Sequence, residues 1–380
     1  MIPHVPHLLL AAAALSLCTL CLAGSPGDAA AGRLFEMQPL FEGVRIPKIV
    51  VAADGTVLAF AKSCRTVRRS TDAGKTWSKP QEVARDASGN AIIDGTTGHV
   101  LVVCPQRACL WRSTDHGATW HKEAITVKPN AVGHGSPDRV PANTGASESG
   151  LTLRHGKHKG RLLMPARVQP PKGNNDQEWW PYNYNCAIYS DDGGKTWQTS
   201  GPVQSGTGEG TLAELSNGHI YYNSRCHMAV DHRRRIAWSY DGGHMWTDWQ
   251  VSEHLYEVGQ PFYFKYGTKP SYGCNAGLVR VPPQATGGRD VLLFSTPDDP
   301  GGTRVRMTVW ASFDRAKTWP VKRLVYEGRS AYSSLSAGKD GTLYLLFESG
   351  KKKLYERITL ARFTLDWLAA GKDWRKLCRD

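Results

Sequence analysis

Ser190-Asp-Asp192-Gly-Gly194-Lys-Thr196-Trp197 is one of five copies of a short pattern in this chain of 380 residues. The other copies read Ser70-Thr-Asp72-Ala-Gly74-Lys-Thr76-Trp77, Ser113-Thr-Asp115-His-Gly117-Ala-Thr119-Trp120, Ser239-Tyr-Asp241-Gly-Gly243-His-Met245-Trp246 and Ser312-Phe-Asp314-Arg-Ala316-Lys-Thr318-Trp319. Each Asp can accept hydrogen bonds from amides of its own turn, the Gly can take a positive φ, and the Trp can pack on the hairpin that the turn closes. The intervals indicate repeats of roughly 40 to 50 residues, which predicts a β-propeller.

These repeats predict turns between strands at the outer rim, and we assign them no chemistry. The last copy carries Ala316 in place of Gly, so its turn is expected to be strained or of another type. The composition also indicates an all-β protein, since 39 Gly and 22 Pro punctuate short apolar runs such as Val57-Leu-Ala-Phe60. With 41% hydrophobic residues the chain can bury a sizeable core, and we expect one domain over 35–370 and a tail over 371–380.

The N-terminus has the composition of an export signal. Leu8 to Leu22 is an apolar run too short to span a bilayer comfortably, and the small residues Ala23-Gly24-Ser25 follow it, as at a signal-peptidase site. We therefore expect a signal peptide over 1–24, a flexible leader over 25–34, a secreted protein and no stable membrane span after cleavage. The first seven residues contain no Lys or Arg, so an uncleaved anchor is the alternative.

Cysteine and histidine spacing predicts neither a metal site nor a fixed disulfide framework. Removing the signal leaves an odd number of cysteines, so at least one thiol should stay free. Cys104 and Cys109 flank a short loop and are the pair that would most readily form a bridge, although sequence cannot fix the connectivity. No paired Cys-x-x-Cys with a matching His is present, and we expect no metal and no cofactor.

The chain carries a formal net charge of +13, which favours anionic partners. The basic residues are spread along the sequence apart from two runs, Arg233-Arg-Arg235 and Lys351-Lys-Lys353, which we interpret as solvated turns. No recognition-helix pattern or aromatic RNA-binding pattern accompanies these runs, so nucleic acid is not an expected partner. Acidic glycans match the excess of positive charge better.

Together with the repeats, a set of motifs in a fixed order resembles the sialidase (neuraminidase) family. The motifs are Val44-Arg45-Ile46-Pro47, Gly208-Glu209-Gly210-Thr211-Leu212, Tyr222-Asn223-Ser224-Arg225, Gly302-Thr303-Arg304, Ser330-Ala331-Tyr332 and Leu345-Leu346-Phe347-Glu348. The resemblance runs in register from about Phe41 to Gly350, and the ordered set is more specific than any single motif. It implies a six-bladed β-propeller with Asp-box turns and an exo-α-sialidase-like hydrolase that removes terminal sialic acid, or a related nonulosonic acid, from sialylated glycoconjugates.

In the family, three arginines bind the carboxylate of the substrate, and the matching residues here are Arg45, Arg225 and Arg304. A planar guanidinium pairs with a carboxylate through two parallel hydrogen bonds and stays charged at physiological pH. Arg306 is a neighbouring candidate for the third position, but it should point to the other face of the sheet. Glu348 matches the family glutamate that orients the first arginine.

Tyr332 matches the family nucleophile, and Glu209 matches the carboxylate that takes its proton. Sialidases are the tyrosine exception among retaining glycosidases. A sialoside already carries a carboxylate on its anomeric carbon, so a neutral phenol assisted by Glu209 avoids bringing two anions together. The implied mechanism retains configuration through a glycosyl-tyrosine intermediate. We interpret the nearby Glu214 as structural or more remote from the substrate.

The sequence departs from the family at the general acid/base. Family members carry this Asp in an extended loop after the strand that ends near Phe60, but the corresponding segment Ala61-Lys-Ser-Cys-Arg-Thr66 is short and contains no acid. Asp94, His134 and Asp138 are candidate replacements, and the last two lie in a Gly/Pro-rich loop. Losing a general acid typically lowers the rate by a factor of about 100 to 10,000.

Two other functions therefore remain open. One is a non-catalytic propeller that binds sialic acid, and the other is an Asp-box glycosidase or lyase that acts on a uronic-acid polysaccharide. The aromatic loop over 174–184 fits either a rim that stacks on sugar rings or simple surface packing. The segments Met164-Pro-Ala-Arg167 and Cys274-Asn-Ala-Gly-Leu278 also resemble family strands, and we expect them to have packing roles.

Overall fold

The computed structural model describes residues 32–130, 144, 147–168, 183–258, 272–300 and 302–378. The expected signal peptide and most of the expected leader lie outside the described residues. The same is true of His134, Asp138 and most of the aromatic loop.

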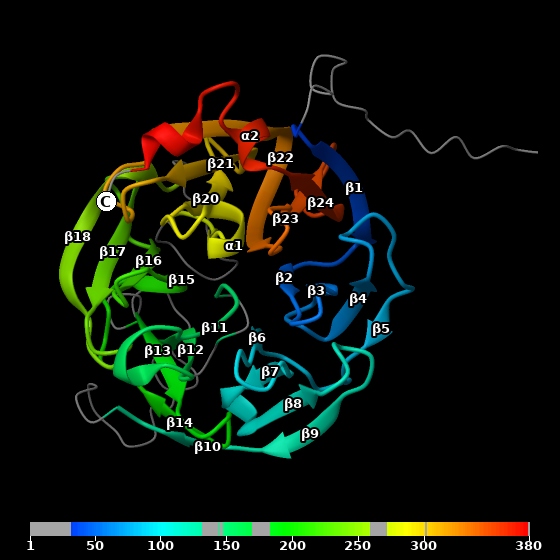
Figure 1. Cartoon of the computed structure of the whole chain (residues 1–380), viewed down its shortest axis with the longest axis vertical. Helices are drawn as coiled ribbons and strands as arrows, with labels where there is room; N and C mark the ends of the chain where they lie inside the picture. Colours follow the sequence, from blue (N-terminus) through cyan, green and yellow to red (C-terminus); the bar gives the residue numbers. More distant parts are fainter. Residues whose placement is uncertain are drawn as a thin grey trace, which may run out of the picture.

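Five sheets are arranged in a ring around a common centre (Figure 1). The first contains β2 (Lys48–Val51), β3 (Val57–Ala61), β4 (Thr66–Ser70) and β5 (Gln81–Glu82), and the second contains β6 (Asn90–Ile93), β7 (Val100–Cys104), β8 (Cys109–Ser113) and β9 (His121–Ala124). The third contains β11 (Leu151–Thr152), β12 (Leu162–Val168), β13 (Tyr184–Ser190) and β14 (Thr196–Thr199), with β10 (Thr126–Lys128) added in parallel to β14. The fourth contains β15 (Thr207–Glu214), β16 (Ile220–Cys226), β17 (Arg233–Ser239) and β18 (Thr247–Tyr256).

The fifth sheet has seven strands and contains both ends of the described chain. Its strands are β19 (Gly277–Arg280), β20 (Leu292–Pro297), β21 (Val305–Ser312), β22 (Val321–Ala337), β23 (Leu343–Gly350), β24 (Arg357–Phe363) and β1 (Phe35–Glu42). The first half of β22 pairs with β21 and the second half with β23, so one strand serves two units of the ring. β1 pairs antiparallel with β24 and thereby closes the ring. The predicted all-β, propeller-like fold is confirmed.

Helical segments are short in the described part of the chain. They are α1 (Pro283–Thr286), α2 (Leu365–Leu368) and the 3-10 turns η2 (Pro105–Arg107), η3 (Gly156–His158) and η5 (Trp374–Leu377). Within the described ranges, none of them has the length and apolar character needed to cross a membrane. The segment that the sequence predicted to be a tail includes η5, whose Trp374 is buried in the core beside Trp367.

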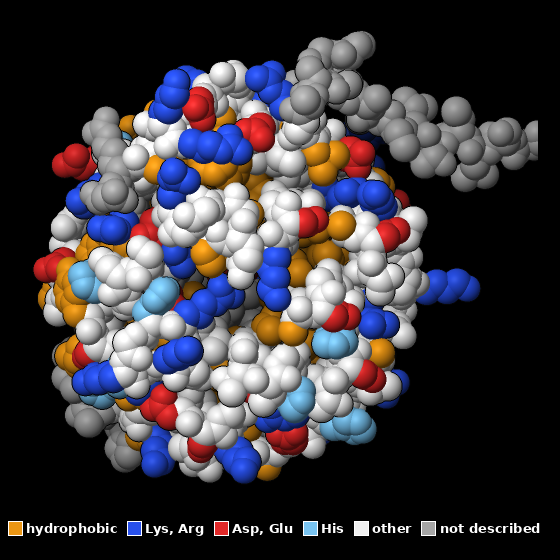
Figure 2. All heavy atoms as spheres, in the orientation of Figure 1, with side chains coloured by type: hydrophobic (Ala, Val, Ile, Leu, Met, Phe, Trp, Pro, Cys, Tyr) orange, Lys and Arg blue, Asp and Glu red, His pale blue; other side chains and the backbone are white. Residues whose placement is uncertain are grey.

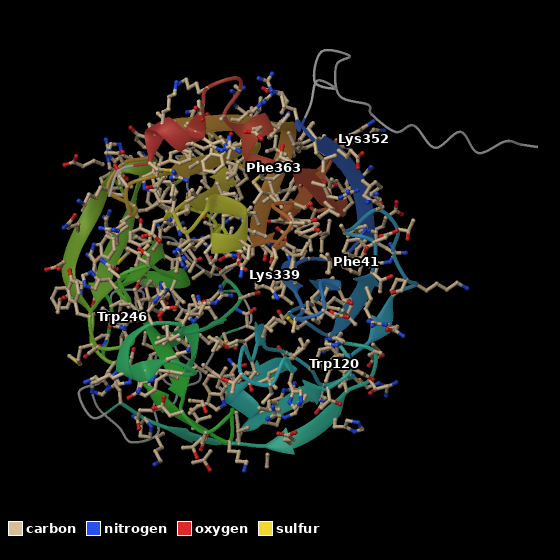
Figure 3. All side chains as sticks on the ribbon, viewed as in Figure 1. Phe41, Trp120, Trp246, Lys339, Lys352 and Phe363 are labelled. Carbon is tan, nitrogen blue, oxygen red and sulfur yellow. The ribbon has the colours of Figure 1, made fainter. Side chains whose placement is uncertain are left out.

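Each repeat forms the turn between the third and fourth strands of its unit, as predicted. In the copy between β13 and β14, Ser190 Oγ donates to Asp192 Oδ1 at 2.7 Å and accepts from Gly194 N at 2.9 Å. Trp197 Nε1 donates to the carbonyl oxygen of Gly194 at 2.9 Å, which fixes the ring against its own turn. The same serine-centred pair of bonds recurs in the other four copies. Trp120 and Trp246, from two of these turns, lie on different sides of the ring (Figure 3).

The last repeat keeps the turn type although it lacks the glycine. Ala316 N donates to Ser312 Oγ at 3.0 Å, and Asp314 accepts from Thr318 N at 2.9 Å. Ala316 has a φ of 64°, in the left-handed region that disfavours residues with a Cβ atom. The turn of the last repeat is therefore of the same type as the others but strained at Ala316.

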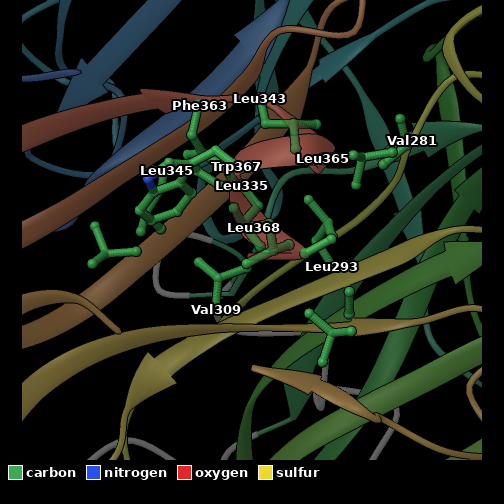
Figure 4. Close-up of a cluster of buried hydrophobic side chains, with 14 of the residues drawn as sticks. Val281, Leu293, Val309, Leu335, Leu343, Leu345, Phe363, Leu365, Trp367 and Leu368 are labelled. Atoms are coloured by element: carbon green, nitrogen blue, oxygen red, sulfur yellow. The ribbon is translucent and has the colours of Figure 1, made fainter. Parts of the chain in front are cut away.

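Apolar side chains fill the space between neighbouring sheets. Figure 4 shows a cluster of buried side chains that includes Leu293, Val309, Leu335 and Phe363 of the seven-stranded sheet and Trp367 of α2. Similar clusters join the other sheets around the ring. Because protein cores are close-packed, these contacts hold the inner strands in fixed positions relative to one another.

A buried polar network joins the inner strands at the centre of the ring. Glu148 accepts from Ser334 Oγ at 2.7 Å and from Leu335 N at 3.3 Å, both in β22. The Glu148 amide donates to Gly210 O of β15 at 2.9 Å, and Ile49 N of β2 donates to Ser334 Oγ at 3.0 Å. These bonds hold β2, β15 and β22 at the same height along the ring axis.

A cavity of about 1240 Å³ opens at one end of this axis. Its lining includes residues that follow the inner strands, among them Asp54, Arg154, Pro283 and Lys339. Lys339 lies near the centre of the face in Figure 3, and basic side chains gather near the same centre in Figure 2. The residues that precede or begin the inner strands lie toward the other end.

The disulfide expected between Cys104 and Cys109 is not formed. The two residues are cross-strand partners in β7 and β8, but both are thiols that form no disulfide. The Cys104 sulfur instead accepts a hydrogen bond from Ser88 N at 3.4 Å, and burial raises the pKa of its thiol to about 12.

Candidate active site

Residues that match the sialidase motifs meet at the end of the ring opposite the cavity. Arg45 precedes β2, Arg304 precedes β21, and the others are Glu209 in β15, Arg225 in β16, Tyr332 in β22 and Glu348 in β23. They come from three different sheets, so the closed ring rather than any local motif brings them together.

Tyr332, Glu209 and Arg225 form a buried hydrogen-bonded cluster. Tyr332 Oη donates to Glu209 Oε1. Arg225 Nη1 lies 2.5 Å from Glu209 Oε2 and 3.2 Å from Tyr332 Oη. All three residues are buried, Arg225 to 1% exposure. The carboxylate thus lies within reach of the phenolic proton, as the resemblance implied.

Burial and neighbouring charges give the two acidic groups of this cluster opposite protonation states. Burial and the nearby Glu209 carboxylate raise the pKa of Tyr332 above its usual value, so the phenol is neutral. Burial alone would raise the pKa of Glu209, but the charges of Arg225 and Arg167 bring it well below its usual value. A neutral phenol therefore donates to an ionised carboxylate, which is the arrangement that activates a hydroxyl nucleophile.

Arg45 is held by Glu348 through two parallel hydrogen bonds. Arg45 Nε lies 3.0 Å from Glu348 Oε1, and Nη2 lies 3.2 Å from Oε2. The Glu348 carboxylate also accepts from Ile46 N at 2.9 Å and from Tyr332 N at 3.2 Å. Glu348 is fully buried, whereas the Arg45 side chain is 40% exposed. One carboxylate therefore orients both the exposed arginine and the backbone of the tyrosine.

The third arginine, Arg304, also lies near Tyr332. The guanidinium carbon of Arg304 is 5.5 Å from the centre of the Tyr332 ring, and that of Arg45 is 5.1 Å from it. Tyr355 connects the two arginines, because its hydroxyl accepts from Arg304 Nη1 at 3.1 Å and its ring lies 3.7 Å from the Arg45 guanidinium. The three arginines therefore surround one phenol.

Sequence reasoning missed three residues that shape this site. Tyr355 belongs to no motif, since it lies in the connection between β23 and β24. Arg167 was expected to have a packing role, but its charge acts on Glu209 and Tyr332. His227 packs on Gly208 so closely that a Cβ atom there would lie 1.8 Å from His227 Nε2, and burial lowers the pKa of His227 well below its usual value. Only the Met-Pro-Ala-Arg segment gave a signal beforehand.

The short connection between β3 and β4 is a tight left-handed turn without an acidic residue. Lys62, Ser63 and Cys64 have φ values of 55°, 53° and 66°. Beside this turn, Lys48 is fully buried and donates from Nζ to Pro47 O at 3.0 Å. Burial lowers the pKa of Lys48, while the carboxylates of Glu148, Glu209 and Glu348 counteract that effect.

The structure does not bring Asp94 to Tyr332. Asp94 follows β6 at the cavity end of the ring, and its carboxylate accepts from Thr96 N at 2.9 Å and from Thr97 Oγ1 at 2.6 Å within its own turn. It therefore caps a turn, and the hypothesis that it replaces the acid/base is not supported. His134 and Asp138 lie outside the described residues.

Two further residues have structural roles. Arg306 forms an exposed ion pair with Glu327 at 2.6 Å. Glu214 accepts from Arg154 N at 2.7 Å and His155 N at 3.0 Å at the cavity end of the ring. Among the described residues, no group of three or more His, Cys, Asp or Glu has the arrangement of a metal site.

The ring of sheets and the repeated turns define an Asp-box β-propeller. The family model of the BNR repeat-like domain matches residues 104–345, and that of the BNR/Asp-box repeat matches residues 68–79. Because the first match covers more than half of the chain, the protein belongs to the BNR repeat-like domain family.

Comparison with known proteins gives sialidases as relatives. A sialidase of Micromonospora viridifaciens is 29% identical over 393 residues, which cover 91% of this chain and 56% of that protein. A sialidase of Bacteroides fragilis (strain YCH46) is 28% identical over 309 residues, which cover 74% of this chain and 53% of that protein. The chain therefore spans just over half the length of these curated relatives.

A solved structure agrees with the fold. The Hadza microbial sialidase Hz136 matches with a TM-score of 0.64 at 24% sequence identity, over 85% of this chain and 66% of that chain. At this level of identity the likeness establishes the propeller fold alone.

Proposed function

We propose that this protein is a secreted, retaining exo-α-sialidase that removes terminal sialic acid, or a related nonulosonic acid, from glycoconjugates. Tyr332 is the nucleophile, Glu209 accepts its proton, and Arg45, Arg225 and Arg304 bind the substrate carboxylate. The observation that carries the proposal is the hydrogen bond from the buried Tyr332 phenol to Glu209 inside a group of three arginines.

The chemistry of this arrangement suits a sugar with a carboxylate at its anomeric carbon. Tyr332 Oη attacks that carbon while its proton moves to Glu209, and the bond to the leaving oxygen breaks. Water then displaces the tyrosine, so two inversions restore the original configuration. A neutral phenol is the suitable nucleophile because a carboxylate would approach the anionic substrate against electrostatic repulsion.

The leaving oxygen requires a proton as the glycosidic bond breaks. The connection between β3 and β4 contains no acid. His134 and Asp138 remain the candidate donors. A protein without any donor would bind sialic acid and turn it over slowly, because general-acid catalysis contributes a factor of about 100 to 10,000. The missing acid therefore favours a sialic-acid-binding propeller as the second candidate function.

We also propose that the ring has six blades. Four sheets supply one blade each, and the seven-stranded sheet together with the shared strand β22 supplies two. In this view the two halves of β22 are the outer strand of one blade and the inner strand of the next.

A fluorogenic α-sialoside assay with Tyr332→Phe beside the wild type tests the proposed function. Removing the nucleophile should lower kcat by about 1000-fold or more, while calorimetric binding of free sialic acid should change little. Full activity of Tyr332→Phe would contradict the mechanism. Sialic acid binding by the wild type without turnover would identify a binding protein. Cleavage of a uronic-acid polymer without sialic acid binding would identify a glycosidase or lyase that acts on uronic-acid polysaccharides.

A further inference from the structure

Three consecutive carbonyl groups hold three arginines beside the proposed site. Tyr272 O accepts from Arg225 Nε at 2.8 Å, and Gly273 O accepts from Arg304 Nη2 at 2.9 Å. The next carbonyl, of Cys274, accepts from Arg234 Nη1 at 2.9 Å. The segment 272–274 precedes β19 and belongs to no strand. Strand pairing therefore does not hold it in place.

A buried ion pair fixes this segment. Arg234 Nη1 lies 3.0 Å from Glu257 Oε2, and neither side chain has any exposed surface. Glu257 also accepts from Cys274 N at 3.3 Å and from Cys226 N at 2.9 Å. Its carboxylate therefore ties the 272–274 segment to β16 at the residue that follows Arg225.

Arg234 is itself fixed on the neighbouring strand. Its Nε donates to Asn223 Oδ1 at 2.7 Å, two residues before Arg225 in β16. The basic run Arg233-Arg-Arg235 was interpreted as a solvated turn, and that interpretation is wrong for Arg234. The run lies in β17, where side chains alternate between the two faces, and this alternation buries the middle arginine.

We infer that Arg234 and Glu257 are positioning residues that hold Arg225 and Arg304 in register for the substrate carboxylate through the carbonyls of the 272–274 segment. The inference rests on the proposed function, because it assigns a role to residues that support the same site. Both residues are buried, and they contact Asn223, Cys226 and Cys274, which support the site.

Stability alone is a weak explanation for this pair. Desolvating two charges costs about as much as their attraction returns, and apolar replacements of buried ion pairs are often neutral or stabilising. Arg234 and Glu257 together contact both β16 and the 272–274 segment. The pair therefore also fixes the relative positions of these two elements. An arginine displaced by about 1 Å can lower catalysis by about 100-fold.

The role has a second, electrostatic consequence. Arg225 is the leading charge that holds the pKa of Glu209 below its usual value. If Arg225 moves away, Glu209 should titrate at a higher pH, and the acid limb of the kcat/KM profile should shift upward with it. A side chain that only stabilised the fold would not move this limb.

The test compares Glu257→Gln with Asp290→Asn in the sialoside assay. Asp290 is a matched control because it is also a buried carboxylate in ion pairs with arginines, with Arg280 at 2.5 Å and Arg315 at 3.2 Å. Unlike Glu257, it lies at the cavity end of the ring beside Ser216. We expect Glu257→Gln to lower kcat/KM by about 10- to 100-fold and to raise the pH of the acid limb. Asp290→Asn should stay within about twofold of the wild type and keep its profile.

The outcomes separate this inference from the proposed function. A wild type without sialidase activity contradicts the proposed function. If the wild type is active but Glu257→Gln has the same kinetics and pH profile as Asp290→Asn, the positioning role is overturned. If Glu257→Gln does not fold, Asn223→Ala removes the acceptor of Arg234 Nε and the donor to Tyr221 Oη but leaves the ion pair between Arg234 and Glu257 in place. It should give a smaller loss with the same upward shift. An unchanged profile in Asn223→Ala would then overturn the inference.

Discussion

Ala316 has the left-handed backbone conformation that the turn requires, although its Cβ atom disfavours that conformation. The equivalent positions in the other four copies are glycines with φ between 80° and 94°. Ala316 has the same left-handed sign because the serine and aspartate bonds of the turn are retained. The turn chemistry therefore outweighs a steric cost of about 1–2 kcal/mol.

Ala316→Gly should relieve that cost. Part of the gain is lost because glycine makes the unfolded chain more flexible by about 0.4–1 kcal/mol, so we expect a net stabilisation of about 0.5 kcal/mol. Urea unfolding measures it. Gly74→Ala, where a Cβ atom would lie 3.1 Å from Arg362, is the reverse control and should destabilise by more than 1 kcal/mol. A destabilised Ala316→Gly would indicate that burial of the methyl group matters more than φ.

Arg45→Lys keeps the positive charge but loses the planar fork that meets Glu348 and stacks on Tyr355. In the sialoside assay we expect KM to rise about 10- to 100-fold with a smaller change in kcat, since the arginine binds ground state and transition state alike. Arg112→Lys is the control, because Arg112 makes an equivalent paired contact with Glu123 at 2.7 and 3.0 Å away from the site. Equal effects of the two changes would contradict a specific role for Arg45.

How well a residue could be predicted depended on whether its partners are encoded in a motif. Tyr332 and Glu209 were named beforehand because each stands in a recognisable segment, and the fold then brings them into contact. Tyr355 and Glu257 carry no local signal, since their roles arise from contacts across the ring. Asp94 resembled a candidate acid only because the direction of β6 along the axis cannot be read from sequence.

The inner strands were predictable as apolar runs, but the polar network that joins them was not. Glu148 links the start of the third sheet to β22 across the centre of the ring. Burial raises the pKa of its carboxyl to about 6, although Lys48 and three hydrogen bonds counteract the effect. This group therefore binds its proton more tightly in the folded protein than in the unfolded chain.

That shift predicts a pH dependence with a definite sign. Because the folded pKa of Glu148 is raised, its favourable contribution is complete below the unfolded value of 4.5 and is lost as pH rises through about 6. Glu148→Gln does not titrate, so its unfolding free energy relative to the wild type should improve by about 2 kcal/mol between pH 4.5 and 7. Denaturant unfolding of both proteins across this range measures the difference. A difference that stays constant with pH would show that Glu148 does not titrate there.

The repeated turns indicated the strand units, whereas the way the ring is completed required the structure. Apolar alternation in β22 does not reveal that its two halves pair with different neighbours. The N-terminal strand likewise finds its partner at the other end of the chain, where Phe35 faces Phe363 and Glu42 faces Arg357. Pairings of such long range leave no local pattern, so the closure of the ring could not be predicted.

Closure by β1 predicts the effect of removing it. A chain that begins at Gly43 loses the buried side chains of Leu40 and Phe41 and the stacking of Phe35 on Trp367 at 4.2 Å. Burial of each large apolar side chain contributes about 1.5–3 kcal/mol, and these terms together approach the 5–15 kcal/mol that stabilise a typical domain.

We therefore expect the shortened protein to unfold far below the wild-type Tm and to associate through the exposed edge of β24. Activity should be lost as well, because Arg45 follows β1 directly and needs a closed ring to reach Tyr332. Phe41→Ala, which keeps the backbone pairing, should lower the unfolding free energy by only about 3–5 kcal/mol and keep the association state of the wild type. Calorimetry and light scattering distinguish the two variants. A shortened protein with an unchanged Tm would mean that packing between the sheets, rather than pairing of the chain ends, holds the ring closed.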